Sequence, residues 1–360
     1  MNTFECPTRI VSGEGALSYM QKLDAKCLLV VTDPFFAKNG TAERVCQLSG
    51  AEKTEIFSQV APDPTVTLAA QGAAVVRQLQ PDTVVALGGG SAMDCAKAMV
   101  YFSGVDARLV AVPTTSGSGS EVTDFAVLTH EGVKHPLVDG KLRPHTAILD
   151  SSLLSSLPKG LIADTGFDVL SHALEAFVAT GADAITDALA QAAFCTAFAQ
   201  LPASYSGNTG VRLRLHMASC MAGMAFTQAG LGLCHAISHS LGGVFHVPHG
   251  RLNAILLPAV VGMNSTVAGD RYANLAARAG LGGSAKTLAV KGLQNGLVRL
   301  RRELGLPATL SQAGITPQAL YREMPRIVEA ALADPCCATN PLPVKDYTVR
   351  RVLEEVAGRG

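Results

Sequence analysis

Charge is scarce in this chain. Asp, Glu, Lys and Arg together make up 16% of its 360 residues, and the formal net charge is zero. Without a net positive charge or a run of basic residues, neither nucleic acid nor an anionic membrane surface is expected as the main partner. Hydrophobic residues make up 48% of the chain, so we expect sizeable buried cores and the interface of a homodimer or larger homo-oligomer.

Features of exported and membrane-spanning proteins are missing as well. The nine cysteines stand at irregular positions rather than in a disulfide framework, and several lie among small apolar residues, where reduced cysteine packs as a small hydrophobe. The N-terminus has neither the charged start nor the apolar core of a signal peptide. No charge-free apolar stretch reaches membrane-spanning length without a His or Gly interruption. We therefore expect a soluble, cytoplasmic protein that does not bind membranes.

The first part of the chain alternates between β-branched runs and helical patterns. The runs lie at residues 27–33, 82–90, 107–115 and 145–150, with helical patterns at 64–80 and 91–102. Almost continuously apolar strands, each followed by a helix, predict a parallel sheet covered by helices on both faces.

The pattern changes after the Ser-rich segment at residues 150–160, which contains a Pro and a Gly. Strand signals vanish there, and stretches rich in Ala, Leu, Met and Gly with helical spacing follow at 163–200, 211–229, 230–245, 285–304 and 317–333. We predict an α/β domain over residues 1–157 and an all-helical domain over residues 158–360, whose small residues let helices approach closely.

Two loops rich in glycine and hydroxyl groups follow strands of the predicted sheet. The strand at 84–88 runs into Gly89, Gly90 and Ser91, and a second strand opens into residues 114–121, which read TTSGSGSE. Glycine lets a ligand approach the backbone, and a helix N-terminus, which Ser91 would cap, offers N–H groups to a phosphate. An ordinary tight turn would explain one such loop, but two of them favour a phosphate-bearing cofactor.

Asp33 ends the first predicted strand. An acidic side chain at this place can accept hydrogen bonds from the adenosine ribose of NAD and repel the 2′-phosphate of NADP. A cap or turn before Pro34 is the alternative interpretation.

One carboxylate and several imidazoles then appear at the spacing of a mononuclear metal site. Two pairs, Asp168 with His172 and His235 with His239, are each four residues apart, and such residues share one face of a helix. Burying these groups without compensation would cost about 2–7 kcal/mol for each polar group, which a metal ion can offset. The spacing leaves six candidates for about four ligand positions: Asp168, His172, His235, His239, His246 and His249. Glu175 is a further carboxylate nearby, more typical of a residue that supports ligands or lies on the surface.

Four motifs in order along the chain carry a family resemblance. They are GGGSAMDCAKA at 88–98, PTTSGSGSE at 113–121, GFDVLSHALEAF at 166–177 and GLGLCHAISHSLGGVFHVPHGRLNAILLP at 230–258. The chain resembles the iron-containing (group III) alcohol dehydrogenases over nearly its whole length. Within that family it is most similar to the propanol dehydrogenases of propanediol-utilisation microcompartments.

The resemblance implies a Rossmann-like N-terminal dinucleotide-binding domain, an all-helical C-terminal metal-binding domain and an active site in the cleft between them. It implies iron(II), with zinc as the alternative, and NAD(H) as cofactors. The implied metal ligands are Asp168, His172, His235 and His249, while His239 is the nearby histidine that is not a ligand and to which we assign proton relay. The implied cofactor contacts are Asp33, Gly89, Gly90, Ser91, Asp94, Thr114, Thr115, Ser118 and Lys134.

The activity that the resemblance implies is reversible hydride transfer between NADH and a short aliphatic aldehyde, propanal or acetaldehyde. The implied location is the cytoplasm, inside a bacterial microcompartment, with a shell protein as a further candidate partner. Two alternatives remain: a zinc-dependent polyol dehydrogenase of the glycerol dehydrogenase type, and a non-catalytic protein that docks onto a microcompartment shell.

Overall fold

The structure is a computed structural model that describes residues 3–131 and 133–358. Within these residues the chain forms two compact units. One extends from Glu5 to Leu157, and the other holds the chain from Pro158 on, together with Thr3 and Phe4.

The first unit is built on a six-stranded sheet in which all neighbouring strands are parallel. Its order is β1-β8-β5-β4-β2-β3, with strands β1 (Arg9–Gly13), β2 (Cys27–Thr32), β3 (Lys53–Phe57), β4 (Thr83–Gly88), β5 (Arg108–Pro113) and β8 (Thr146–Asp150). The helices of this unit are η1 (Ala16–Lys22), α1 (Pro34–Lys38), α2 (Thr41–Ser49), α3 (Val66–Leu79), α4 (Gly90–Ser103), η2 (Ser120–Val122), η3 (Gly140–Leu142) and, after β8, η4 (Ser151–Leu154).

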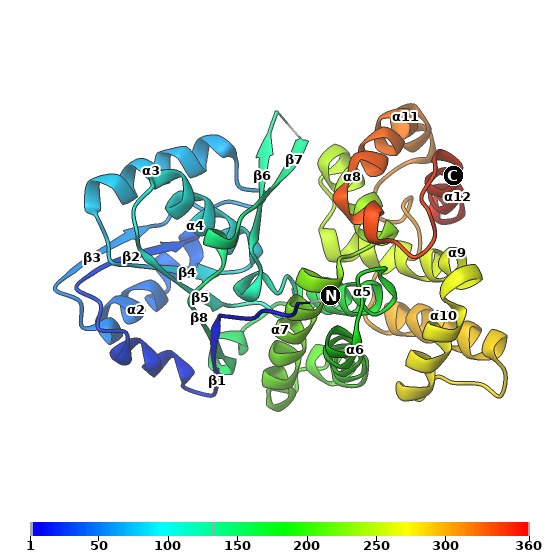
Figure 1. The fold of residues 1–360 in the computed structure, drawn as a ribbon, viewed down its shortest axis with the longest axis horizontal. Helices are drawn as coiled ribbons and strands as arrows, with labels where there is room; N and C mark the ends of the chain where they lie inside the picture. Colours follow the sequence, from blue (N-terminus) through cyan, green and yellow to red (C-terminus); the bar gives the residue numbers. More distant parts are fainter. Residues whose placement is uncertain (1–2, 132, 359–360) are drawn as a thin grey trace. The chain divides into compact units, whose positions relative to one another are not determined.

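Helices cover both faces of this sheet (Figure 1). Side chains alternate between the faces along each strand, so β2 sends Leu29 and Val31 toward α3 and α4, and Leu28 and Val30 toward η1 and α2. Because both faces are buried, the central strands are apolar at nearly every position, which explains the continuous runs in the sequence.

The strand order places a topological switch point between β2 and β4. The chain passes from β2 to β3 on one side and then crosses to β4 on the other side of β2. In open α/β sheets ligands bind at such a point, beyond the carboxyl ends of the strands.

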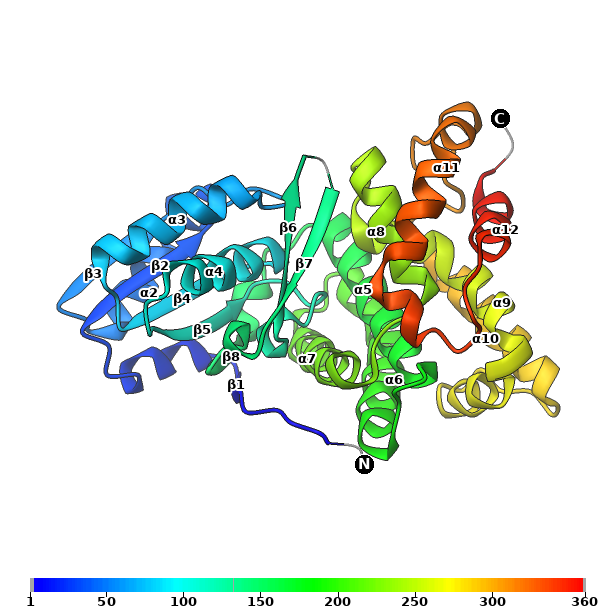
Figure 2. The same ribbon diagram turned by 45° about the horizontal axis from the view of Figure 1, so that its top comes forward.

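A separate antiparallel hairpin joins β6 (Phe125–His130) to β7 (Val133–Val138) (Figure 2). β6 contacts α4, the helix that follows the glycine-rich turn.

The second unit is helical. Its elements are α5 (Lys159–Val178), α6 (Ala184–Tyr205), η5 (Thr209–Val211), α7 (Arg212–Ala229), α8 (Leu233–Phe245), α9 (His249–Arg278), α10 (Lys286–Glu303), α11 (Pro317–Ala333), η6 (Pro335–Thr339) and α12 (Asp346–Val356). α5 contacts α6, α7 and α9, and nearly all its residues from Ile162 on are buried. A helix surrounded on all sides can carry polar residues only where other polar groups or a ligand meet them.

α9 is the longest helix, and by length and composition alone it could cross a membrane. Two-thirds of its most apolar window (67%) is buried inside the protein, as in the core helix of a soluble protein. Pro258 lacks the N–H that would bond to the carbonyl of Ala254, and Arg301 of α10 donates to that oxygen at 3.3 Å.

The predicted fold class, an α/β parallel-sheet domain followed by an all-helical part, is confirmed. The sequence patterns did not indicate the edge strands β1 and β3 or the hairpin. They also left out α9 and α12, and the stretch predicted as helical at 163–200 is interrupted between α5 and α6.

Candidate active site

Asp168 and His172 lie one turn apart on α5, in its buried segment. His172 Nε2 is 3.9 Å from Asp168 Oδ1. The predicted i, i+4 pair therefore presents both side chains on one face of the helix.

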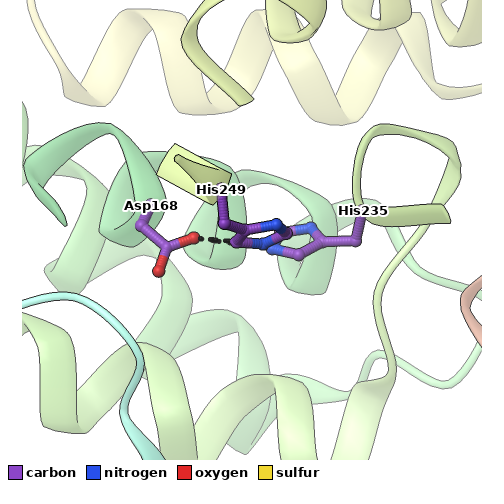
Figure 3. Close-up of side chains that lie close together, drawn as sticks. All are labelled: Asp168, His235 and His249. Carbon is purple, nitrogen blue, oxygen red and sulfur yellow. Dashed lines mark ion pairs between the residues drawn. The ribbon is translucent and has the colours of Figure 1, made fainter. Parts of the chain in front are cut away.

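α8 and α9 bring two further imidazoles to this carboxylate. His235 Nε2 lies 3.9 Å and His249 Nε2 lies 3.5 Å from Asp168 Oδ1. The three side chains point toward one another (Figure 3), and their ligand atoms all lie within 4.8 Å of one another. The predicted ligand His172 lies outside this group of mutually close ligand atoms. It adjoins the group through Asp168, and its ring stacks on that of His235 with centroids 4.5 Å apart.

The distances and the donor set fit a divalent metal ion. Zinc holds nitrogen and oxygen ligands at about 2.0–2.2 Å, so two ligand atoms of a tetrahedral site stand about 3.4 Å apart. Asp168 Oδ1 lies 3.5–3.9 Å from the three imidazole nitrogens, slightly more than this separation. One anionic oxygen with three imidazoles suits iron(II) or zinc.

A glycine permits the approach of α9 to α5. A Cβ at Gly250 would stand 1.9 Å from the carbonyl oxygen of Asp164, so only glycine allows the start of α9 to pack directly on the α5 backbone. Arg251 also forms a bidentate ion pair with Asp164, in which Nε lies 3.2 Å from Oδ1 and Nη2 lies 2.9 Å from Oδ2. These contacts fix His249, the first residue of α9, opposite Asp168.

Glu175 holds His235 in place. It is buried at 2% exposure, and its Oε2 lies 2.6 Å from His235 Nδ1. It also accepts hydrogen bonds from the backbone N–H groups of Gly232, Cys234 and His235 at the start of α8. With Nδ1–H donating to the carboxylate, the lone pair of His235 Nε2 faces Asp168 and would be available to a metal ion.

Burial governs the protonation of Glu175 and His235. It raises the pKa of Glu175 to about 7, although the backbone N–H groups at the start of α8 and the charge of His172 act in the opposite direction. Burial, together with the charges of His172 and His239, lowers the pKa of His235 well below its usual value. His235 is therefore a neutral imidazole at pH 7, the form that binds metal.

Asn253, which the sequence patterns did not single out, also lies in the site. It stands one turn beyond His249 on α9, and its Nδ2 donates to Asp168 Oδ1 at 2.9 Å. Its Oδ1 accepts from Ser238 at 2.5 Å, which fixes the orientation of the amide. Its spacing from His249 was the only sequence signal that could have found it.

His239 occupies the rim of the cluster. Its ring stacks on that of His249 with centroids 5.1 Å apart, and its Nδ1 lies 2.8 Å from Asp334 Oδ2. Burial would raise the pKa of Asp334, but hydrogen bonding to His239, the charge of His239 and bonding to Cys336 outweigh it and lower that pKa to about 2. An ionised Asp334 accepts from Nδ1–H, so Nε2 of His239 remains able to exchange a proton.

His246, the sixth candidate from the spacing, is exposed at the end of α8. Its backbone is left-handed (φ 55°), and it ends the helix. It lies outside the group of converging ligand atoms.

The glycine-rich loops meet at the carboxyl edge of the parallel sheet. Gly88 pairs with Pro113 across β4 and β5, and the Thr114 N–H donates to the Gly88 carbonyl at 2.9 Å. The two loops are also in close contact, since a Cβ at Gly89 would stand 3.3 Å from Thr115 Oγ1. One at Gly90 would stand 3.3 Å from Ser118 Cβ.

The N-terminus of α4 lies in this turn, beside the switch point. Ser91 was expected to cap the helix, which was wrong: Gly89 is the N-cap residue, and Ser91 lies inside α4. Glycine has no side-chain acceptor, which leaves the first N–H groups suited to a phosphate.

Asp33 follows β2 on the other side of the switch point. Its Oδ1 caps α1 by accepting from the N–H groups of Phe35 and Phe36, as the alternative interpretation has it. Its Oδ2 lies 3.9 Å from a Cβ position at Gly88, beside the glycine turn. One carboxylate can both cap α1 and face a ribose.

The other two predicted cofactor contacts lie away from the strand ends. Asp94, on α4, accepts from Ser120 Oγ at 3.2 Å, and its burial raises its pKa to about 6, although the charge of Lys97 acts in the opposite direction. Lys134, on β7, pairs with Asp63 at 2.7 Å.

Comparison with known proteins places this chain in a family. Residues 7–151 match the model for iron-containing alcohol dehydrogenases, and residues 162–357 match the C-terminal model for the iron-containing alcohol dehydrogenase family. The 1-propanol dehydrogenase PduQ of Citrobacter freundii is 41% identical over 99% of this chain and 100% of its own length. The chain belongs to the iron-containing alcohol dehydrogenases.

Solved structures of the family agree with the fold of this alcohol dehydrogenase. A 1,3-propanediol oxidoreductase superposes with a TM-score of 0.93 and is 31% identical, over 99% of this chain and 100% of that one. The sulfoacetaldehyde reductase of Bifidobacterium kashiwanohense, solved in complex with NAD+, has a TM-score of 0.91 at 27% identity over 100% of both chains. The predictions of an enzyme, and of iron(II) and NAD(H) as the cofactors, are confirmed at the level of the family.

Proposed function

We propose that this alcohol dehydrogenase reduces a short aliphatic aldehyde, propanal or acetaldehyde, to the primary alcohol with NADH and so regenerates NAD+. The observation that carries the proposal is the convergence of His235 and His249 on Asp168, with His172 also 3.9 Å from Asp168 Oδ1. The substrate class rests on similarity to the 1-propanol dehydrogenase and to the 1,3-propanediol oxidoreductase.

The proposed metal ligands are Asp168, His172, His235 and His249, and the proposed metal is iron(II). When bound, the ion supplies a Lewis acid that stabilises the negative charge developing on the carbonyl oxygen as hydride arrives. Glu175 and Asn253 hold the ligand atoms in position for it.

His239 is the proposed proton donor to the product oxygen. Its Nδ1 is held by Asp334, so Nε2 is the atom that gives up or receives the proton. Its side chain is 28% exposed, so solvent can replace the proton.

The dinucleotide is proposed to bind at the switch point of the parallel sheet. The proposed contacts are those that the resemblance implies: Asp33, Gly89, Gly90, Ser91, Asp94, Thr114, Thr115, Ser118 and Lys134. Asp33 would accept from the ribose hydroxyls, which favours NADH over NADPH, and the α4 N-terminus with the hydroxyls of the second loop would hold the pyrophosphate.

An NADH-oxidation assay tests the proposal. Metal-free protein is prepared anaerobically, reconstituted separately with iron(II) and with zinc, and offered C2–C6 aldehydes. We expect turnover with iron(II), highest for the C2 and C3 aldehydes. NADH oxidation absent for every aldehyde with either metal would contradict the proposal.

Two controls address the alternatives. Oxidation of glycerol by the zinc form in preference to propanol would favour a polyol dehydrogenase. Binding to microcompartment shell protein without any NADH oxidation would favour a docking protein. Co-sedimentation with assembled shells also tests the proposed location inside a cytoplasmic microcompartment and the shell protein as a partner.

A further inference from the structure

Lys97 is a lysine buried inside the dinucleotide-binding unit. It lies on α4, two turns beyond the glycine-rich turn, and is 1% exposed. Lysine is almost never fully buried unless its ammonium group is paired, so hydrogen-bond acceptors and negative charges are expected around Lys97.

Its hydrogen-bond partners lie at the end of the second glycine loop and directly after it. The ammonium nitrogen donates to Ser120 Oγ at 2.9 Å and to Thr123 Oγ1 at 2.9 Å. It is also within 3.0 Å of the Thr123 carbonyl and 2.9 Å of the Phe125 carbonyl. Four acceptors for three N–H donors leave the ammonium group fully used, and two of them are backbone oxygens that fix the path of the chain.

Carboxylates around the ammonium group compensate its charge. Asp94, one turn earlier on α4, accepts from Ser120 Oγ, which thus links the two side chains. Burial lowers the pKa of Lys97 to about 8, while the charges of Asp94, Glu121 and Asp124 act to raise it. The group is thus held mainly as a cation at neutral pH.

The residues that Lys97 contacts, between 120 and 125, continue directly from the second glycine loop, whose hydroxyls are proposed to hold the pyrophosphate. The Ser120 N–H donates to Ser118 Oγ at 3.3 Å, and Ser118 in turn stands against Gly90 at the start of α4. The loop is therefore attached to α4 at two places: at Gly90, by close packing, and at Lys97, by hydrogen bonds.

We propose that Lys97 is a positioning residue for the dinucleotide, because its ammonium group holds residues 118–125 so that the loop hydroxyls stay beside the α4 N-terminus. This inference rests on the proposed cofactor site. Lys97 itself does not reach a ligand at the strand ends, since all its donors are used inside the unit.

The test uses the Lys97→Met and Ser120→Ala variants in the full-length protein. Methionine keeps much of the length of the lysine stem and removes the donors, whereas Ser120→Ala removes the link between Lys97, Asp94 and the loop. NADH affinity is measured by fluorescence titration without aldehyde, and thermal unfolding is measured alongside. We expect Lys97→Met to weaken NADH binding by about tenfold or more and Ser120→Ala by about threefold, with kcat at saturating NADH and bound iron unchanged.

A destabilised control separates positioning from general loss of stability. Val30→Ala removes core volume on the other face of the sheet, so it should lower the melting temperature without altering NADH affinity. A Lys97→Met protein that melts earlier yet binds NADH like the wild type would overturn the inference. If Lys97→Met does not fold, an unchanged affinity in Ser120→Ala overturns it. Failure of the wild type to bind NADH would instead refute the proposed cofactor site.

Discussion

Removal of the Glu175 carboxylate should loosen the proposed metal site and the start of α8, the helix that carries His235. Glu175 accepts from three backbone N–H groups at the start of α8 and from the imidazole of His235. In Glu175→Ala these buried donors lose their acceptor, and His235 is free to change its tautomer. In Glu175→Gln one oxygen remains, but the amide NH₂ group faces donors that it cannot satisfy.

The size of the effect follows from the number of donors. An unsatisfied buried donor costs about 1–3 kcal/mol, and relief from burying a carboxylate whose pKa is raised to about 7 offsets part of the sum. We therefore expect Glu175→Ala to lower the free energy of unfolding of the metal-free protein by about 3–5 kcal/mol. Loss of a carboxylate that orients a metal-binding histidine reduces metal affinity by about 10–100-fold. Glu175→Gln should fall between the wild type and Glu175→Ala in both measurements.

Chelator competition under anaerobic conditions measures iron(II) affinity, and denaturant unfolding measures stability. Asp183→Ala is a matched control, since Asp183 caps α6 by accepting from two backbone N–H groups. It should cost about 1 kcal/mol and leave iron affinity unchanged. If Glu175→Ala bound iron(II) with wild-type affinity, Glu175 would have no part in orienting His235.

Two further predictions concern the packing of α9 at Gly250 and the effect of pH on stability through Asp334. In Gly250→Ala the new Cβ would collide with the Asp164 carbonyl 1.9 Å away, so the start of α9 must shift; we expect at least about tenfold weaker iron binding by chelator competition, and none in Gly160→Ala, where a Cβ meets open space. A gain of iron affinity in Gly250→Ala would contradict this packing. The fold lowers the pKa of Asp334 to about 2 from its usual value of about 3.9. Between these two pH values the folded protein binds fewer protons than the unfolded chain, so the free energy of unfolding decreases as the pH decreases. The Asp334 contribution of about 2–3 kcal/mol is complete above about pH 4 and lost as the pH falls through 2, so unfolding of the metal-free wild type and Asp334→Asn should converge there; a difference that stayed constant from pH 7 to pH 2 would contradict the assignment.

The sequence predicted the buried parts of the sheet better than its edges. β2, β4, β5 and β8 read as continuous apolar runs because helices cover both faces. β1 and β3 lie at the two edges, and β3, with the sequence KTEIF, is mostly exposed. An edge strand of this kind has no apolar pattern to mark it.

The grouping of Asp168 with the histidines could be predicted because helical spacing brings these residues together locally. Asp168 with His172 and His235 with His239 need only a helix, and the short turn before His249 places it nearby. Spacing could not say that His246 ends α8 and stays exposed, because that depends on where the helix stops.

The pairing of the supporting carboxylates with their histidines could not be predicted from spacing. Glu175 and His235 are separated by 60 positions, and His239 and Asp334 by 95, so only the packing of separate helices makes them partners. The hydrogen bonds of Lys97 could not be predicted for another reason. Lys97 stands within an apolar helical pattern, and its acceptors, from Ser120 to Phe125, are more than 20 positions away and meet it only in the fold.

In the proposed enzyme, Asp168 and the histidines around it hold iron while the dinucleotide binds independently at the sheet. His249→Ala tests this proposal most directly, with bound iron and NADH affinity measured on the same anaerobic preparation. We expect loss of bound iron and of aldehyde reduction, with NADH affinity close to that of the wild type. Retention of stoichiometric iron and normal turnover in His249→Ala would contradict it.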